Sequence, residues 1–217
     1  MDGFRLLPGY LDAAAQAELL VAVRDVLAEA PPYQPEMPRS GQKMRVRMSN
    51  AGPLGWYTDR AGGYRYIAQH PLTGRPWPAI PAPLLALWQA LTGYAAAPEC
   101  CLINLYDAEA RMGLHQDRDE QAFDAPVLSV SLGATAIFRL GGTSRTAPTR
   151  SFRLASGDVM LLGGPARLAF HGIDRIQPGS SRLVPDALIP GGGRINLTLR
   201  RVTPFAIAHP AAAAVPA

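Results

Sequence analysis

The distribution of hydrophobic and polar positions changes character about halfway along the chain. In the first part, apolar residues recur at helical spacing over residues 12–30, where Leu19, Val23 and Leu27 share a face. Asp12 is a suitable N-cap residue in front of this stripe, and two prolines follow its end. The pattern predicts an amphipathic helix over 12–30.

A second, shorter apolar stripe predicts a helix over residues 83–91. Leu84, Trp88 and Leu91 fall on one face of such a helix. Pro83 suits its first turn, and Gly93 suits its end. We therefore expect two helices in the first half of the chain.

From residue 101 onward the pattern becomes one of short strands separated by glycine and proline. Seven segments have this character: 101–106, 127–132, 136–140, 151–155, 158–162, 167–171 and 194–200. Two helices followed by a run of strands predict an α+β fold, with N-terminal helices packed on one face of a double-sheet barrel or jelly roll. We expect one domain over residues 1–209, with its core at 101–201, and a disordered, Ala- and Pro-rich tail at 210–217.

The last predicted strand alternates strictly between polar and apolar residues. Its polar face carries Arg194, Asn196, Thr198 and Arg200. Such a strand is either half exposed to solvent or directs two guanidinium groups into the barrel mouth, where they would hold a dicarboxylate. Asn104 and Tyr106 form a similar polar pair on one face of residues 101–106, and a buried pair of this kind needs hydrogen-bond partners.

Residues 31–80 are rich in proline, glycine, aromatic residues and positive charge. Over residues 43–48 the basic side chains of Lys43, Arg45 and Arg47 alternate with apolar ones. An extended segment here would be basic on one side and apolar on the other. It is either a solvated edge strand, or a flap whose basic side faces phosphate groups while its apolar side faces a substrate.

The tripeptide His115-Gln116-Asp117 is the most informative polar unit. In an extended segment its imidazole and its carboxylate point the same way. One more histidine would complete a two-His-one-carboxylate triad, which binds Fe(II) and leaves three positions open. His171 is the candidate because it ends the predicted strand 167–171, whereas His70 lies in a loop and His209 in the tail. The alternative is that His171 is an ordinary hydrogen-bonded residue at a strand end.

Composition and charge narrow the class of protein. Hydrophobic residues make up 48% of the 217 residues and charged residues 18%, which is typical of a globular chain. No stretch approaches the ~20 apolar residues of a membrane span, and the first apolar run lacks the basic start of a signal peptide. The adjacent Cys100 and Cys101 cannot form an ordinary disulfide, so we expect a cytoplasmic protein. The net charge of +4 is a mild indication of an anionic partner.

Seven short motifs resemble the AlkB family of Fe(II)- and 2-oxoglutarate-dependent dioxygenases, specifically its bacterial alkylation-repair type. In the family's order, they are Met48–Trp56, Gly74–Pro78, Cys101–Tyr106, Leu114–Glu120, Ser129–Gly133, Phe170–Ile173 and Arg194–Arg200. The units His-Gln-Asp-x-Asp-Glu and Arg-x-Asn-x-Thr-x-Arg are together the most specific. The resemblance implies a double-stranded β-helix (jelly-roll) core and assigns residues 31–80 to a nucleotide-recognition flap.

The resemblance also implies a role for each matching residue. The iron ligands would be His115, Asp117 and His171. The distal carboxylate of 2-oxoglutarate would be held by Asn104, Tyr106 and Arg194, and its metal-chelating end supported by Asn196 and Arg200. The base pocket would be lined by Met48, Trp56 and Tyr64, with Asp119 accepting a hydrogen bond from the exocyclic amine and with Ser129 and Arg145 nearby.

The implied reaction is oxidative demethylation of 1-methyladenine and 3-methylcytosine in single-stranded DNA, with RNA as a further substrate. O2 and 2-oxoglutarate would be consumed, and formaldehyde, succinate and CO2 released. A monomer without a membrane partner is expected. Two alternatives stay open, namely a 2-oxoglutarate-dependent hydroxylase or demethylase of tRNA and a non-catalytic nucleic-acid-binding barrel. Departures from the family pattern bear on lesion preference: Leu162 replaces a tryptophan, an extra residue stands at Gly62-Gly63, and the segment between His171 and Arg194 is long.

Overall fold

Two antiparallel sheets and a separate hairpin make up most of the structure. The computed structural model describes residues 1–205, so the expected tail at 210–217 and His209 lie outside the described residues. The larger sheet has six strands, in the order β1 (Phe4–Leu7), β10 (Val159–Leu162), β7 (Val127–Gly133), β12 (Arg194–Arg200), β5 (Cys100–Tyr106) and β2 (Arg47–Ala51). The smaller sheet has four, in the order β6 (Met112–His115), β11 (His171–Ile176), β8 (Ala136–Leu140) and β9 (Arg150–Leu154). The hairpin consists of β3 (Gly55–Asp59) and β4 (Gly63–Ile67).

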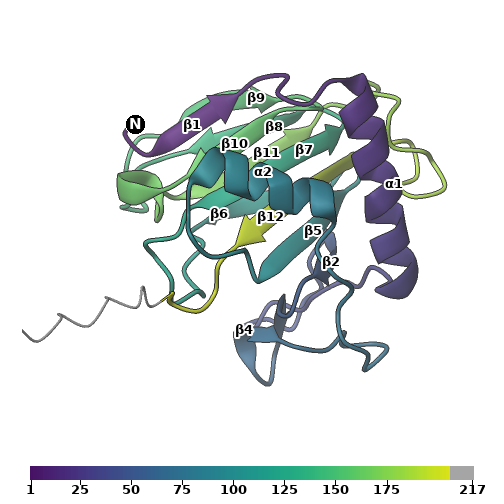
Figure 1. The fold of residues 1–217 in the computed structure, drawn as a ribbon, viewed down its shortest axis with the longest axis horizontal. Helices are drawn as coiled ribbons and strands as arrows, with labels where there is room; N and C mark the ends of the chain where they lie inside the picture. The colour runs from purple at the N-terminus through teal and green to yellow at the C-terminus, as the bar shows by residue number, and fades with distance from the viewer. Residues whose placement is uncertain (206–217) are drawn as a thin grey trace, which may run out of the picture.

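The two helices, α1 (Ala13–Glu29) and α2 (Ala82–Thr92), lie across one face of the six-stranded sheet (Figure 1). The Asp12 carboxylate accepts a hydrogen bond of 2.8 Å from the backbone N–H of Ala15, which caps the first turn of α1. Gly93 ends α2 with a φ of 63°, a left-handed conformation that glycine adopts without a Cβ clash. Both helices agree with their predicted ranges to within one residue at each end.

The alternation along β12 divides the interior into two cores. Ile195, Leu197 and Leu199 pack in one cluster with the buried faces of α1 and α2. The opposite face of the six-stranded sheet packs against the four-stranded sheet, in a second cluster that includes Phe138 and Ile173. The strands at the centre of the large sheet are therefore covered on both faces, and the half-exposed alternative for residues 194–200 is wrong. The two facing antiparallel sheets are consistent with the predicted jelly-roll core.

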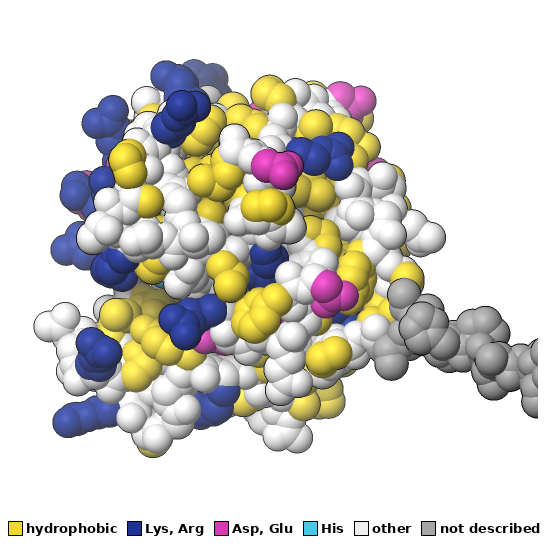
Figure 2. Space-filling view, turned by 90° about the vertical axis from the view of Figure 1, so that its left-hand side faces the viewer, with side chains coloured by type: hydrophobic (Ala, Val, Ile, Leu, Met, Phe, Trp, Pro, Cys, Tyr) yellow, Lys and Arg dark blue, Asp and Glu magenta, His cyan; other side chains and the backbone are white. Residues whose placement is uncertain are grey.

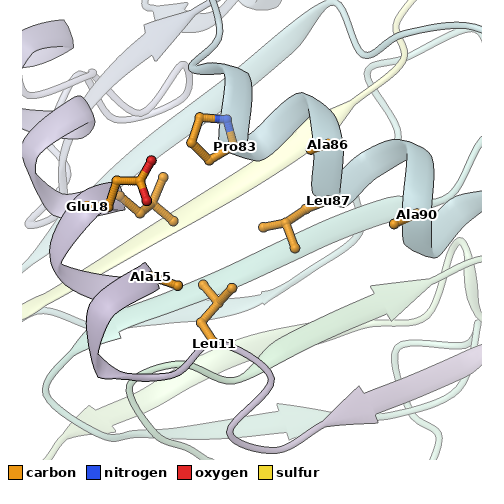
Figure 3. A pocket seen from close by; sticks show the side chains of 8 residues that line it. Leu11, Ala15, Glu18, Pro83, Ala86, Leu87 and Ala90 are labelled. Atoms are coloured by element: carbon orange, nitrogen blue, oxygen red, sulfur yellow. The ribbon is translucent and has the colours of Figure 1, made fainter.

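A shallow apolar hollow lies between the two helices (Figure 3). Leu11 and Ala15 at the start of α1 face Leu87 and Ala90 of α2 across it, and Glu18 is its one charged lining residue. The hollow is on the helix side of the six-stranded sheet, so the sheet separates it from the space between the two sheets.

The predicted strand 167–171 is wrong. A short 3-10 turn, η1 (Gly164–Ala166), precedes this segment, and the side chain of Arg167 is buried and donates hydrogen bonds to two backbone carbonyls. The chain therefore stays irregular until His171, which begins β11 instead of ending a strand. The short strands β1, β2, β3, β4 and β6 were not predicted, apart from an extended segment over residues 43–48, of which only Arg47 and Met48 lie in a strand.

None of the described helices is both long enough and apolar enough to cross a membrane.

Candidate active site

The three candidate metal ligands meet at one end of the four-stranded sheet. β6 and β11 pair so that His115 lies opposite His171. A Cβ on Gly172 would come within 2.6 Å of the Met112 carbonyl oxygen, so the close approach of these two strands requires glycine. The ligand atoms of His115, Asp117 and His171 all lie within 4.8 Å of one another.

Hydrogen bonds orient both imidazole rings. The Nδ1 atom of His115 lies 2.9 Å from the Gly113 carbonyl oxygen, and that of His171 lies 2.9 Å from the Ala169 carbonyl oxygen. Each carbonyl can accept only from a protonated Nδ1, which leaves Nε2 as the free ligand atom on each ring. These two Nε2 atoms lie 3.7 and 3.8 Å from the carboxylate oxygens of Asp117.

The charges in the site favour a bound divalent metal ion. Burial and the neighbouring His115 lower the pKa of His171 to about 4, so its ring is neutral at physiological pH. Burial alone would raise the pKa of Asp117, but the charge of the neighbouring Arg200 guanidinium holds it below its usual value. Two imidazoles and one carboxylate converge here, and this donor set is the one that non-haem Fe(II) uses. The residues therefore fit the metal.

A buried ion network lies behind Asp117. Arg200 donates to Asp117 at 2.8 Å and to Glu120 at 3.2 Å, and Arg167 donates to Glu120 at 3.1 Å. Tyr66, from β4, donates to the same Glu120 carboxylate and accepts a hydrogen bond from Arg200 at 3.3 Å. Two guanidinium groups and two carboxylates are thus paired away from solvent. Sequence reasoning missed Arg167, Glu120 and Tyr66 as parts of the site, because none of them stands in a pattern that indicates burial.

The polar face of β12 borders the metal ligands and suits a dicarboxylate. Arg194 is 1% exposed, and its Nη2 donates to the Ser131 hydroxyl at 2.8 Å. Burial lowers the pKa of Arg194 to about 10, so the group stays cationic near neutrality. Within the described residues, the Nε atoms of Arg194 and Arg200 and the Oδ1 atom of Asn104 are buried without a hydrogen-bond partner. Unpaired buried donors on one wall are expected where a bound anion completes the site.

The candidate metal ligands and the polar residues of β12 line one cleft of about 890 Å³ between the two sheets, and Figure 2 shows its opening as a hollow with Lys and Arg side chains on both sides. Every residue assigned a role by the resemblance lines this cleft. In chain order these residues are Met48, Trp56, Tyr64, Asn104, Tyr106, His115, Asp117, Asp119, Ser129, Arg145, His171, Arg194, Asn196 and Arg200. Leu162 lines it as well, whereas no residue between Ile173 and Arg194 does.

Two aromatic rings of the hairpin stand at the cleft. Trp56 and Tyr64 stack with ring centroids 5.7 Å apart and planes inclined by 25°. The indole N–H of Trp56 donates to Asp119 at 2.8 Å and so fixes that carboxylate beside the rings. Ser129 lies deeper and accepts a hydrogen bond of 2.7 Å from Asn196, while Arg145 is exposed.

The predicted basic side of residues 43–48 needs one correction. Lys43 and Arg45 are exposed, as a phosphate-facing surface requires. Arg47 is only partly exposed and donates to the Leu188 carbonyl at 3.0 Å, so its guanidinium is already bound within the protein. Its partner comes from a distant loop, which the local sequence pattern does not reveal.

Comparison with known proteins gives a consistent result. Residues 3–200 match the 2OG-Fe(II) oxygenase superfamily. The alpha-ketoglutarate-dependent dioxygenase AlkB homolog of Caulobacter vibrioides is 57% identical over 201 residues, which cover 93% of this chain and 88% of that protein. The dioxygenase AlkB of Escherichia coli is 41% identical over 191 residues, covering 86% and 85%. The solved structure of OsALKBH1 matches with a TM-score of 0.73 and 30% identity, covering 93% of this chain and 99% of that one.

Proposed function

This chain belongs to the 2OG-Fe(II) oxygenase superfamily and, within it, to the AlkB dioxygenases, and from that premise we propose that it removes N-linked methyl groups from damaged bases in single-stranded DNA. The observation that carries the proposal is the position of Asp119. This carboxylate is held by Trp56 and lines the same cleft as the three metal ligands. A base that contacts both residues would therefore lie close to the metal.

The pocket favours bases that carry a positive charge. Adenine methylated at ring nitrogen 1 and cytosine methylated at ring nitrogen 3 are cations. A cationic base against Trp56 and Tyr64 gains cation–π attraction of about 0.5–2 kcal/mol. Asp119 adds a charge-assisted hydrogen bond from the exocyclic amine. A neutral, undamaged base would gain neither contribution, so the site favours the lesion.

The protein residues bind and orient the reactants. His115, Asp117 and His171 would hold Fe(II), and Arg194, Tyr106 and Asn104 would hold the distal carboxylate of the cosubstrate 2-oxoglutarate. When bound, the metal supplies the activation of O2 that oxidises the methyl group while 2-oxoglutarate becomes succinate and CO2. The cleft keeps the methyl group near the metal.

A base must leave its stack to enter the cleft, so single strands are the easier substrate. Lys43 and Arg45, on the proposed nucleotide-recognition flap of residues 31–80, would contact phosphates.

The test is mass spectrometry of a single-stranded oligonucleotide that carries one 3-methylcytosine. It is incubated with the protein, Fe(II), ascorbate and O2, with and without 2-oxoglutarate, beside an oligonucleotide with unmodified cytosine. Loss of one methyl group only when 2-oxoglutarate is present is the expected result. An unchanged methylated oligonucleotide, with succinate still formed, would reject DNA demethylation and make methylated tRNA the next substrate to assay.

Asp119→Ala should separate base recognition from cosubstrate chemistry. Loss of one charge-assisted hydrogen bond is expected to lower demethylation about 10- to 100-fold, while substrate-free succinate formation changes much less. Formaldehyde and succinate are measured in parallel. Asp124→Ala is the matched control, since Asp124 contacts only Tyr94 through its carboxylate among the described residues. An equal loss of both products in Asp119→Ala would contradict its role as a base reader.

Arg194→Lys should weaken cosubstrate binding. Lysine retains the charge but loses the planar pair of donors, so the Kd of 2-oxoglutarate is expected to rise about 10- to 100-fold. The Kd is measured by calorimetry with Mn(II) in place of Fe(II). Arg139→Lys, on the outer side of β8 and paired with Asp174, serves as the control and should leave the Kd unchanged. An unchanged Kd in Arg194→Lys would remove Arg194 from the cosubstrate site.

A further inference from the structure

Two contacts join the hairpin to the loop that carries the metal ligand Asp117. Trp56 of β3 donates to Asp119, and Tyr66 of β4 donates to Glu120. The hairpin supplies the aromatic rings of the base site, and the loop 116–120 supplies a metal ligand. The base site and the metal site therefore share one set of hydrogen bonds.

The contact through Tyr66 continues to the metal ligand itself. Arg200 donates to the Tyr66 oxygen at 3.3 Å and to Glu120 at 3.2 Å through the same Nη1 atom. Its Nη2 atom donates to Asp117 at 2.8 Å. Arg200, Glu120 and Asp117 are all buried, and hydrogen bonds between charged groups out of contact with water are strong and depend on one another. A displacement of the Tyr66 hydroxyl therefore also alters the hydrogen bond that positions the Asp117 carboxylate.

The two strands of the hairpin are held differently. β3 is fixed to the body of the protein, because the backbone N–H of Trp56 donates to Asn50 and its carbonyl accepts from Asn50 and Tyr33. Among the described residues of β4, Tyr66 has the one side chain that hydrogen-bonds outside the hairpin. Tyr66 is consequently the side-chain attachment of β4 to the body, beside the hydrogen bond of 2.9 Å that the Ile67 backbone carbonyl accepts from the Trp77 indole N–H.

A base in the pocket displaces a ring that β4 carries. A flat ring between two others needs about 7 Å between them, at roughly 3.5 Å contact on each face. Trp56 and Tyr64 are 5.7 Å apart, so they have to separate, and the exposed Tyr64 is the ring that is free to move. Tyr64 and Tyr66 are two residues apart on one strand and point to the same face. A shift of the β4 backbone at Tyr64 therefore moves Tyr66 as well.

We propose that Tyr66 is a positioning residue that couples occupancy of the base site to the metal ligand Asp117 through Glu120 and Arg200. The proposal rests on the proposed function in one respect, namely that a base enters beside Trp56. When a base is bound, β4 and the loop 116–120 move together into the positions that they hold during catalysis. Without the Tyr66 hydroxyl, the rate at which 2-oxoglutarate is converted to succinate depends less on whether a methylated base is bound.

The first experiment uses reciprocity and needs no nucleic acid. A coupling between two sites acts equally in both directions. Saturating Mn(II) is expected to slow backbone hydrogen exchange in β4 about fivefold in the unmodified protein and to leave it unchanged in Tyr66→Phe. Tyr94→Phe is the control, because it loses a hydroxyl bonded to Asp124 at 2.8 Å outside this network and should respond like the unmodified protein. An equal response to Mn(II) in Tyr66→Phe, or none in the unmodified protein, would overturn the proposal.

The second experiment measures coupling during turnover with the 3-methylcytosine oligonucleotide. The ratio of methyl groups removed to succinate formed is expected to fall about fivefold in Tyr66→Phe and to stay unchanged in Tyr94→Phe. An unchanged ratio in Tyr66→Phe would contradict the coupling. If the unmodified protein removes no methyl group while Mn(II) still slows exchange in β4, the proposed substrate is wrong and the link between hairpin and metal ligand stands.

Discussion

Replacement of Asp117 by alanine is expected to abolish demethylation and also to destabilise the metal-free protein. Asp117 is a proposed metal ligand, and it is the carboxylate that Arg200 contacts at 2.8 Å. Removing one member of a buried ion pair leaves the other without its partner, which costs about 3–5 kcal/mol in the free energy of unfolding. Glu120 remains beside Arg200, so we expect a loss at the lower end of that range. Urea denaturation of metal-free protein gives this value.

His115→Ala is the matched variant. It removes another proposed metal ligand from the same site, so activity should be lost in the same way. The ring of His115 is partly exposed, and its one hydrogen bond is to the Gly113 carbonyl, so the metal-free protein should lose no more than about 1 kcal/mol. Equal stability of the two variants would show that Asp117 does not stabilise Arg200. Retained activity in either would exclude that residue as a ligand.

The largest loss of stability is expected for Glu120→Ala. The Glu120 carboxylate is fully buried and accepts from Arg167, Arg200 and Tyr66. Its removal leaves Arg167 without any carboxylate, and the expected cost is about 3–5 kcal/mol. For a chain of this length that cost lowers Tm by about 6–20 °C. Thermal unfolding followed by circular dichroism measures the change.

Asp174→Ala provides the comparison for Glu120→Ala. Asp174 also pairs with an arginine, Arg139, at 2.9 Å, but both side chains are more than one third exposed. Solvent screens such a pair, and its loss should cost at most about 1 kcal/mol. If the two variants unfold at the same temperature, the buried network contributes no more than a surface ion pair.

The sequence predicted those parts of the fold that depend on local spacing. The helix over 12–30 followed from one apolar stripe and one capping residue, and the two faces of residues 194–200 followed from alternation alone. Alternation could also place Asn104 and Tyr106 on one face, because a strand repeats every two residues whatever it pairs with.

Features that depend on distant partners could not be predicted in this way. The strand assigned to 167–171 failed because the buried side chain of Arg167 holds that segment in an irregular path toward Asp117 and Glu120. The register that brings His171 opposite His115 is set between β6 and β11, which are more than fifty residues apart in the chain. Comparison of the histidines made His171 the candidate partner of His115, and the family resemblance implied the same pair, but neither gave this register.

The position of β12 has a consequence for how such an enzyme can change over evolutionary time. β12 is paired on both sides, by β7 and β5, at the centre of the larger sheet, and it carries Arg194, Asn196 and Arg200. Exposing that strand requires opening most of the fold. The aromatic rings proposed to receive the base stand instead on a hairpin outside both sheets. Hairpin positions outside the Trp56 and Tyr66 contacts, such as the exposed Tyr64, can therefore change without altering the residues of β12, so the range of substrates can shift while those residues are inherited unchanged.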